Sequence, residues 1–279
     1  MSESVSNSPF IALSSNLHNG YGYAPEKPFE FAQSSNFIEL NSAEVAKLIG
    51  LMPMLFQVIR SEGSTMIRFG LASGLGEENC LVHPVNGKFL LPYVPAALRA
   101  YPFRLIKAKA QGEDKPQEML AVFQAEVDKA FAKGQGEAIL AEGQLTAGKG
   151  KGLMTFLNQL NQRAAVDQKA LHSVLESGIL IPMNIQVKLS EDSEQTQTVR
   201  PDLFRVDEGK LRELSAETLQ TLQRTGAMGF IYAHLLSMDK FQNLKKAVEV
   251  HSKLKQQANA NEVDLEKMFD DDDSDVLKF

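Results

Sequence analysis

The chain has no tryptophan and only one cysteine, Cys80, among its 279 residues. One cysteine cannot form an intramolecular disulfide, and it excludes every Cys-x-x-Cys metal or redox motif. The five histidines include no pair at i,i+4 spacing, so a helical zinc motif is missing too. Without tryptophan, a carbohydrate platform built on indole rings is disfavoured. We therefore predict neither a metal nor a cofactor, and no residue is assigned a catalytic role.

Long apolar runs are also missing. No stretch approaches 18 apolar residues, so no transmembrane helix is expected. Residues 1–28 have neither a basic start nor a continuous apolar core, so they do not resemble a Sec signal peptide. These absences predict a cytoplasmic location, with the cell surface, reached by a route other than Sec, as the alternative.

The body of the chain carries no net charge. The formal charge of −6 comes entirely from residues 261–279, where eight acids stand against two bases, which leaves 27 bases and 27 acids elsewhere. A neutral body excludes a strongly basic nucleic-acid binder. We therefore expect a protein partner of unknown identity and no direct contact with nucleic acid.

Composition divides the chain into three parts. Residues 1–28 are rich in Ser, Asn, Gly and Pro and are interpreted as a flexible N-terminal arm. Residues 29–256 hold the predicted folded domain. Apolar periodicity fades from residue 257 onward, so residues 257–279 are interpreted as a disordered acidic tail.

The order of predicted elements favours an α+β fold, a mainly antiparallel sheet with a long central helix and C-terminal helices. Short β-rich runs come first, and two of them form a hairpin over residues 55–71. Apolar residues at steps of three and four predict a long helix over residues 153–176, ended by Gly178. Strict alternation then predicts one strand over residues 181–189, with its partner over 199–206.

Capping residues place the shorter helices. Ser42 is expected to begin a helix over residues 43–50, and Ser215 one that ends at Gly226. The nearly all-apolar run 227–236 predicts a buried helix, and an apolar stripe continues over residues 241–254.

A glycine-rich segment at residues 143–149 matches the first seven positions of a phosphate-binding loop. The eighth position needs Ser or Thr to hold Mg²⁺, and in this chain it is Gly150. The segment is therefore interpreted as a flexible loop before the long helix.

The acidic tail supports several interpretations. Asp271, Asp273 and Asp275 alternate like the start of a calcium loop, but Val276 stands where that loop needs glycine. A solvated tail without a binding role is the simplest interpretation. The alternatives are a docking segment similar to the acidic tips of bacterial single-stranded-DNA-binding proteins and, more loosely, a C-terminal secretion signal. The candidate docking residues are Asp270, Asp271, Asp272, Asp273, Asp275 and Phe279.

Two further segments hold candidate contacts for a ligand or partner. Residues 91–105 combine rigid prolines, aromatic rings and two arginines, which is typical either of a structural connection or of a binding groove. Residues 230–236 place one histidine in an apolar run, where it is either a core residue or a ligand contact. The candidates are Tyr93, Arg99, Tyr101, Phe103, Tyr232 and His234.

These same segments resemble the bacterial SapC family over about residues 28–250. The resemblance rests on LPYVPAALRAYPFRLIKA, on ILIPMNIQVKL and on the stretch from FRVDEGKL to SMDKFQNL. The matching positions are Tyr93, Pro95, Arg99, Tyr101, Pro102 and Phe103, then Val206, Asp207, Glu208, Lys210 and Leu211, then Ile231, Tyr232, Ala233, His234 and Leu235.

The resemblance implies a Gram-negative protein associated with a bacterial surface layer, with no family catalytic residue to transfer. The first hypothesis is thus a SapC-like, non-enzymatic protein with a surface-layer-associated or accessory role. The second is a cytoplasmic enzyme, or an enzyme's partner, with a pocket for a small molecule or peptide. The third is an adaptor whose tail docks through Phe279.

Overall fold

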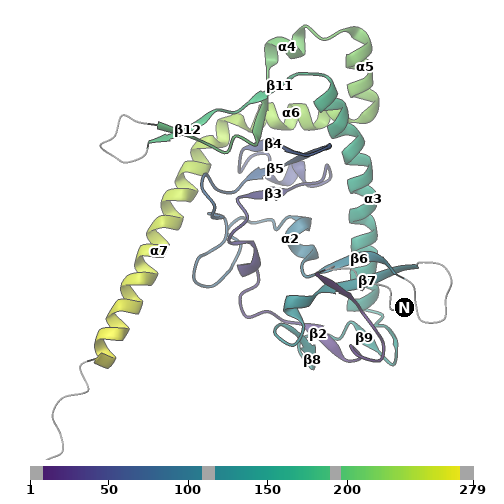
Figure 1. Ribbon diagram of the computed structural model, residues 1–279, viewed down its shortest axis with the longest axis vertical. Coiled ribbons are helices and arrows are strands. Elements are labelled where there is room, and N and C mark those ends of the chain that lie inside the picture. Colours follow the sequence, from purple (N-terminus) through teal and green to yellow (C-terminus); the bar gives the residue numbers. More distant parts are fainter. Residues whose placement is uncertain (1–8, 109–116, 189–195, 271–279) are drawn as a thin grey trace, which may run out of the picture.

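A computed structural model describes residues 9–108, 117–188 and 196–270 of the chain. It has two β-sheet regions, one above the other in Figure 1, and one long helix, α3 (Lys149–Glu176), runs beside both. Every pairing between its named strands is antiparallel. The predicted α+β class, with an antiparallel sheet, a long helix and C-terminal helices, is confirmed.

The larger sheet has five strands in the order β11-β14-β4-β5-β3. Their bounds are β3 (Phe37–Glu39), β4 (Met54–Ser61), β5 (Ser64–Ala72), β11 (Leu180–Pro182) and β14 (Leu203–Val206). The β4–β5 pair confirms the predicted hairpin, and Ser61 pairs with Ser64 across its turn. This turn is tight because Gly63 adopts a φ of +78°, which glycine reaches without a steric penalty.

The first hydrophobic core lies between this sheet and the helices. Helix α6 (Ala227–Ser237) contacts β4 and β14, α3 contacts β5, and α5 (Ala216–Thr225) packs on both helices. Phe56, Phe69 and Phe230 meet here, with ring centroids 5.0 Å apart at each step. The predicted ends of α5 are confirmed, since Ser215 accepts the Thr218 N–H and Gly226 is left-handed.

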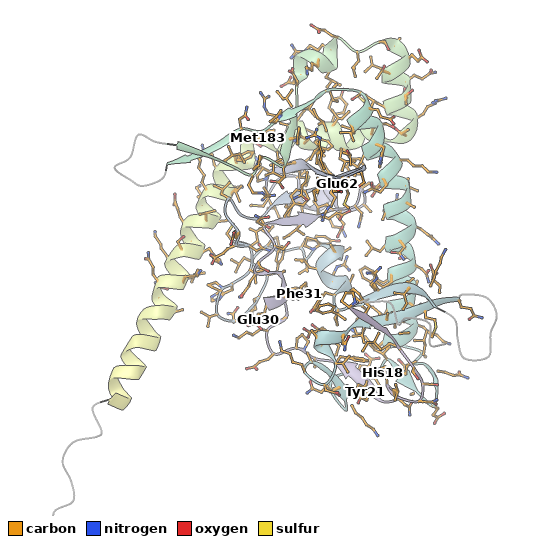
Figure 2. All side chains as sticks on the ribbon, in the orientation of Figure 1. His18, Tyr21, Glu30, Phe31, Glu62 and Met183 are labelled. Atoms are coloured by element: carbon orange, nitrogen blue, oxygen red, sulfur yellow. The ribbon has the colours of Figure 1, made fainter. Side chains whose placement is uncertain are left out.

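The smaller region contains three short sheets around a second core. Its strands are β1 (Phe10–Ala12), β2 (Tyr21–Tyr23), β6 (Phe103–Ala108), β7 (Gln117–Phe123), β8 (Phe131–Lys133), β9 (Leu140–Ala141) and β10 (Gln144–Leu145), in the orders β1-β7-β6, β2-β8 and β10-β9. Phe131 is fully buried at its centre. Figure 2 places His18 and Tyr21 in this region, with ring centroids 5.6 Å apart.

Helix α3 joins the two cores. Leu157 packs in the second core, whereas Leu171 and Val174 pack in the first. Between them, residues 161–166 are all exposed. The middle of α3 therefore crosses from one core to the other with open surface around it.

The interpretation of residues 1–28 as a flexible arm is wrong for residues 9–28. Phe10–Ala12 pairs with β7, and Tyr21–Tyr23 pairs with β8. The polar composition of this segment hides its aromatic residues, which complete the second core. Residues 1–8 lie outside the described residues.

The prediction of one strand over residues 181–189 is wrong in its continuity. Leu180–Pro182 stays in the larger sheet, and β12 (Ile185–Lys188) forms a separate ribbon with β13 (Thr196–Val199). The break falls at Asn184, whose φ is +50°, and the partner side breaks at Arg200, whose φ is +56°. Asparagine adopts this left-handed conformation at little cost, so the strand bends at Asn184. The alternation of apolar and polar residues continues through the bend and therefore does not reveal it. Residue 189 lies outside the described residues.

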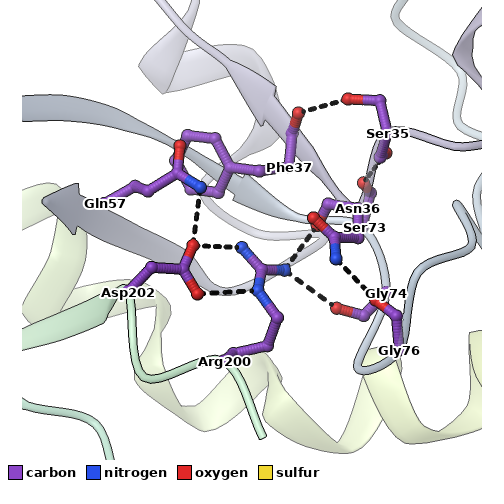
Figure 3. A network of polar contacts seen from close by, with 9 residues as sticks. All are labelled: Ser35, Asn36, Phe37, Gln57, Ser73, Gly74, Gly76, Arg200 and Asp202. Atoms are coloured by element: carbon purple, nitrogen blue, oxygen red, sulfur yellow. Dashed lines mark hydrogen bonds and ion pairs between the residues drawn. The ribbon is translucent and has the colours of Figure 1, made fainter. Parts of the chain in front are cut away.

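Arg200 holds this corner to the larger sheet (Figure 3). Its guanidinium makes two 3.0 Å bonds to Asp202, and its Nη1 donates to the carbonyl oxygens of Asn36 and Gly74. Gln57 donates to the same carboxylate at 2.6 Å. Arg200 is only 8% exposed, whereas the Asp202 side chain is 30% exposed, so the guanidinium is buried in an ion pair that reaches the surface on its carboxylate side.

The remaining helices are α1 (Val45–Leu48), α2 (Ala96–Ala100), α4 (Glu208–Arg212) and α7 (Phe241–Asp270). Ser42 does not cap α1 as predicted: the N-cap residue is Glu44, which makes no side-chain capping bond. The Ser42 N–H donates to Asp167, and the turn before the helix is held by the Ala43 N–H donating to the Asn41 side chain and the Asn41 N–H donating to the Glu44 carboxylate. The predicted start of the tail at residue 257 is also wrong, since α7 continues to Asp270. A helix can continue with polar residues beyond the apolar stripe that packs it against the rest of the protein, as α7 does.

Candidate functional site

An open groove lies along the exposed middle of α3. One wall is α3 itself, and the other comes from α1, from the segment that follows β3, and from the start of α2. The main cavity has a volume of about 720 Å³. A second cavity of about 430 Å³ continues it toward the start of α3, and the two share Arg99 and Phe156. We call these two cavities together the α3 groove.

Glu44 organises one wall of the groove. Its carboxylate is almost fully buried and accepts hydrogen bonds from the Tyr93 hydroxyl at 2.9 Å, from the Ala96 N–H, and from the side chain and N–H of Asn41. These bonds join α1 to the start of α2. Since its acceptor positions are filled by the protein, this carboxylate has little capacity left to bind a ligand, and the Arg99 guanidinium 3.9 Å away partly offsets its charge.

Arg99 lies at the centre of the groove. Its guanidinium donates to the Val94 carbonyl and to the Tyr93 hydroxyl, each at 3.1 Å, and lies 3.9 Å from Glu44. It also lies over the rings of Tyr93 and Phe156, at 5.6 and 5.0 Å from their centroids. Burial, followed by the Glu44 contact, raises the pKa of the Tyr93 hydroxyl, which therefore stays a neutral donor.

Two further cations face the groove. The Lys47 ammonium lies 4.4 Å from the Tyr93 ring centroid, and Arg163 lines the α3 wall. Within the described ranges, neither of them makes an ion pair with a carboxylate. Beside them the α3 wall carries apolar residues, with Leu160 half-buried and Val166 55% exposed, together with the amides Gln159 and Gln162. A groove in which free cations lie beside exposed apolar residues suits an acidic ligand that also carries apolar groups.

The predicted contacts Tyr93 and Arg99 meet in this groove, but Tyr101 lies elsewhere. Tyr101 lines a separate cavity of about 480 Å³, donates to Glu126 at 2.9 Å and stacks on Phe31 at 3.6 Å. Burial, followed by Glu126, raises the pKa of the Tyr101 hydroxyl. Figure 2 labels Phe31 between the two sheet regions, so this stack belongs to their junction.

Three other predicted contacts do not form a site. Phe103 is buried in the second core against Phe131, so its assignment as a ligand contact is wrong. His234 is 1% exposed and has both ring nitrogens bonded to backbone, which makes it the core histidine of the alternative interpretation. Tyr232, on the opposite face of α6, is 53% exposed on a shallow surface of α5 and α6.

Of the candidate docking residues of the tail, the structure places Asp270 alone. Asp270 is the last residue of α7. The other five lie outside the described residues, namely Asp271, Asp272, Asp273, Asp275 and Phe279.

Sequence reasoning missed Glu44, Lys47, Phe156 and Arg163. Lys47 follows Glu44 by three residues, which places both on one helical face. Phe156 and Leu160 were counted with the buried stripe of the long helix, yet both line the groove. The signal was the spacing of Phe156, Leu160 and Arg163, which puts a cation in line with the apolar residues.

The glycine-rich segment does not build a phosphate site. Gly143 belongs to the β9–β10 turn, Gln144 and Leu145 form β10, and Lys149 begins α3. The Lys149 N–H donates to the Glu137 carboxylate at 3.0 Å. A phosphate at the start of α3 would be repelled by the Glu137 carboxylate that already binds there. This supports the interpretation of the segment as a connection before the helix and not as a phosphate-binding loop.

Searches for metal and membrane features add two observations. Among the residues that the structure describes, no group of three or more His, Cys, Asp or Glu side chains could hold a metal ion. Within the same ranges, every helix is either too short or too polar to cross a bilayer.

Comparisons with known proteins identify the family of the chain. No curated protein and no solved structure matches the chain significantly. A family model for SapC matches residues 13–244, which includes β2, both walls of the α3 groove, the core histidine and the start of α7. This range covers more than half of the chain, and we conclude that the chain belongs to the SapC family.

Proposed function

We propose that this SapC-family protein is an accessory binding protein that holds an acidic partner in the α3 groove. One observation carries the proposal: three cations line the main cavity, namely Lys47, Arg99 and Arg163. The one carboxylate among the described residues of this cavity, Glu44, is buried, and its oxygens already accept hydrogen bonds from the protein. The groove is therefore cationic in effect. Nothing in this role requires a chemical step.

The shape of the groove favours a peptide over a small anion. Its two cavities continue into one another past Arg99 and Phe156, and both are open to solvent. An extended acidic segment can pair with the cations while its apolar side chains cover Leu160 and Val166. Arg99 is already held by Tyr93 and Val94, so little side-chain entropy is lost when it binds a carboxylate.

Charge reversal in the groove is expected to weaken binding of an acidic peptide. The Arg163→Glu and Lys47→Glu variants should each lose about tenfold in affinity, corresponding to about 1.4 kcal/mol, because an attraction becomes a repulsion. The measurement is fluorescence anisotropy of a labelled peptide rich in Asp and Phe, at about 50 mM salt. The affinity of the native protein should fall as salt rises.

The control is Lys210→Glu, which reverses an exposed cation on α4 outside the groove. It changes the net charge by the same amount and should leave the affinity within about twofold of the native value. Equal losses in all three variants would mean that net charge alone drives binding, and the groove would then have no role.

The biological setting that we propose is the surface-layer-associated or accessory role suggested by the family, in a Gram-negative bacterium. Family membership supports this setting. If it is right, cell fractionation should recover part of the protein with the envelope or outside the cell, by export or through a bound envelope partner. Recovery only in the cytosolic fraction would contradict a surface role and leave the groove proposal standing.

A further inference from the structure

We infer that the α3 groove is occupied by the acidic segment 270–279 of a second copy of this chain. The inference rests on the proposed function and names the partner of the same site. It commits to self-association in which one copy supplies the acidic segment and the other supplies the groove.

The first argument is charge complementarity. Residues 270–279 carry five aspartates against Lys278, while the main cavity carries three cations whose only carboxylate is already bonded. Elsewhere the sequence has no more than two acids in a row, so no other segment offers a comparable acidic run. Opposite charges of this density steer association and fix its orientation.

The second argument is the order of residues within the segment. The aspartates come first, and Val276, Leu277 and Phe279 follow. In the groove, the three cations adjoin the apolar surface of Phe156, Leu160 and Val166. An acidic stretch followed by apolar residues can therefore pair with the cations and cover the apolar residues of the groove at once.

The third argument is reach, which separates a second copy from the chain's own segment. The first half of α7 is fastened to the body, because Asn243 donates to the Leu51 carbonyl and Lys255 pairs with Glu78. Beyond Lys255, the helix continues for about 22 Å at 1.5 Å per residue before it ends at Asp270. Figure 1 shows α7 and α3 on opposite sides of the molecule.

The nine residues after Asp270 extend at most about 31 Å. A folded body of about 250 residues has a diameter of about 45 Å, from the usual scaling of the radius of gyration. The segment is therefore too short to cross the molecule to its own groove. Because α7 ends away from its own groove, we expect the segment to bind the groove of a neighbouring copy. Such a contact either closes as a symmetric pair or continues as an open chain.

The decisive experiment mixes two full-length variants. One carries Arg163→Glu, which damages the groove and keeps the segment. The other carries Asp271→Asn, Asp272→Asn, Asp273→Asn and Asp275→Asn, which weakens the segment and keeps the groove. Light scattering after size exclusion, over a concentration series at about 50 mM salt, measures the mass.

The native protein should show a mass that rises above the monomer with concentration and returns to it at about 500 mM salt. Each variant alone should stay monomeric, and their mixture should form a one-to-one complex, because the mixture restores one intact groove with one intact segment. Circular dichroism and thermal melts should show that both variants fold as the native chain does.

Three outcomes would overturn the inference. A native protein that stays monomeric at every concentration, or a mixture that does not associate, would do so even where the labelled acidic peptide still binds the groove. A monomer whose peptide affinity rises when residues 271–279 are deleted would show that the segment occupies its own groove. If the labelled peptide also fails to bind, the proposed function itself is wrong.

Discussion

Replacement of Asp202 by alanine is expected to lower the free energy of unfolding by about 3–5 kcal/mol. The loss should be this large because the substitution leaves the Arg200 guanidinium buried without its carboxylate. Chemical denaturation followed by far-UV circular dichroism measures it, and a loss below about 1 kcal/mol would contradict the assigned role.

The network around Arg200 explains why one side chain matters so much. Arg200 and Asp202 come from the corner before β14, Gln57 from β4, and the two carbonyl acceptors from the segments beside β3 and β5 (Figure 3). The pair therefore connects four strands of the larger sheet, β14, β4, β3 and β5. Burial opposes the charge of Asp202, but bonds from Arg200 and Gln57 outweigh it and keep the pKa of this carboxyl below its usual value.

A matched control is Glu208→Ala. Glu208 also pairs with an arginine, Arg212, at 3.1 Å, but both side chains are well exposed on α4. Loss of such a surface pair should cost about 0.5 kcal/mol or less. The double variant Arg200→Met with Asp202→Ala should recover part of the stability lost in Asp202→Ala, since it removes the unpaired charge.

The second large effect is expected at His234. The His234→Ala variant should lose about 4 kcal/mol of unfolding free energy, because it leaves a cavity and removes the partners of two buried backbone groups. In the native chain, the Val206 N–H donates to Nε2 at 3.1 Å, and Nδ1 lies 2.7 Å from the Met54 carbonyl oxygen. The histidine thus joins β14 to the start of β4 beneath α6.

The same residue predicts a pH dependence of stability. Burial, the largest cause, lowers the pKa of His234 to about 4, although its bond to the Met54 carbonyl acts in the opposite direction. The unfolded chain binds this proton at a pKa of about 6.5. Stability is therefore complete above pH 6.5 and decreases as the pH falls toward 4, by about 2 kcal/mol at pH 5. His18 and His251 add to this trend, since burial also lowers their pKa values.

Tyr232→Ala is the control for both measurements on His234. It removes a larger side chain from the same helix, but from its exposed face, and should cost less than about 1 kcal/mol. It should also keep the native pH dependence, whereas His234→Ala should reduce its slope between pH 7 and 5. Equal slopes in both variants would show that His234 is not responsible.

Residues with a strong local preference explain where the sequence predicted structure correctly. Ser215 and Gly226 set the ends of α5, and Gly63 sets the β4–β5 turn, because each of these residue types selects a backbone conformation by itself. The family resemblance was likewise readable, since its residues recur in order along the chain. Continuity of the strand at 181–189 was predicted wrongly, because alternation does not report a single left-handed residue such as Asn184.

Within the candidate site, the sequence predicted residues of the wall that faces α3 but none of the α3 wall itself. Tyr93 and Arg99 were identified because prolines and aromatic rings mark their segment as unusual. Arg163 and Phe156 were not, because a polar residue on a helix is ordinarily solvated and an apolar one is ordinarily core. Only the bridging of two cores by α3 leaves its middle exposed and turns these residues into a wall.

The sequence by itself therefore determined the α+β class, the ends of α5, the β4–β5 turn, the family, and the concentration of charge in residues 261–279. All of these follow from local chemistry or from residue order. Tertiary structure alone decided that His234 is a core residue, that residues 9–28 complete a second core, and that three cations meet beside exposed apolar residues. The physical reason is that burial and charge clustering depend on contacts between segments distant in the chain, which composition and periodicity cannot report.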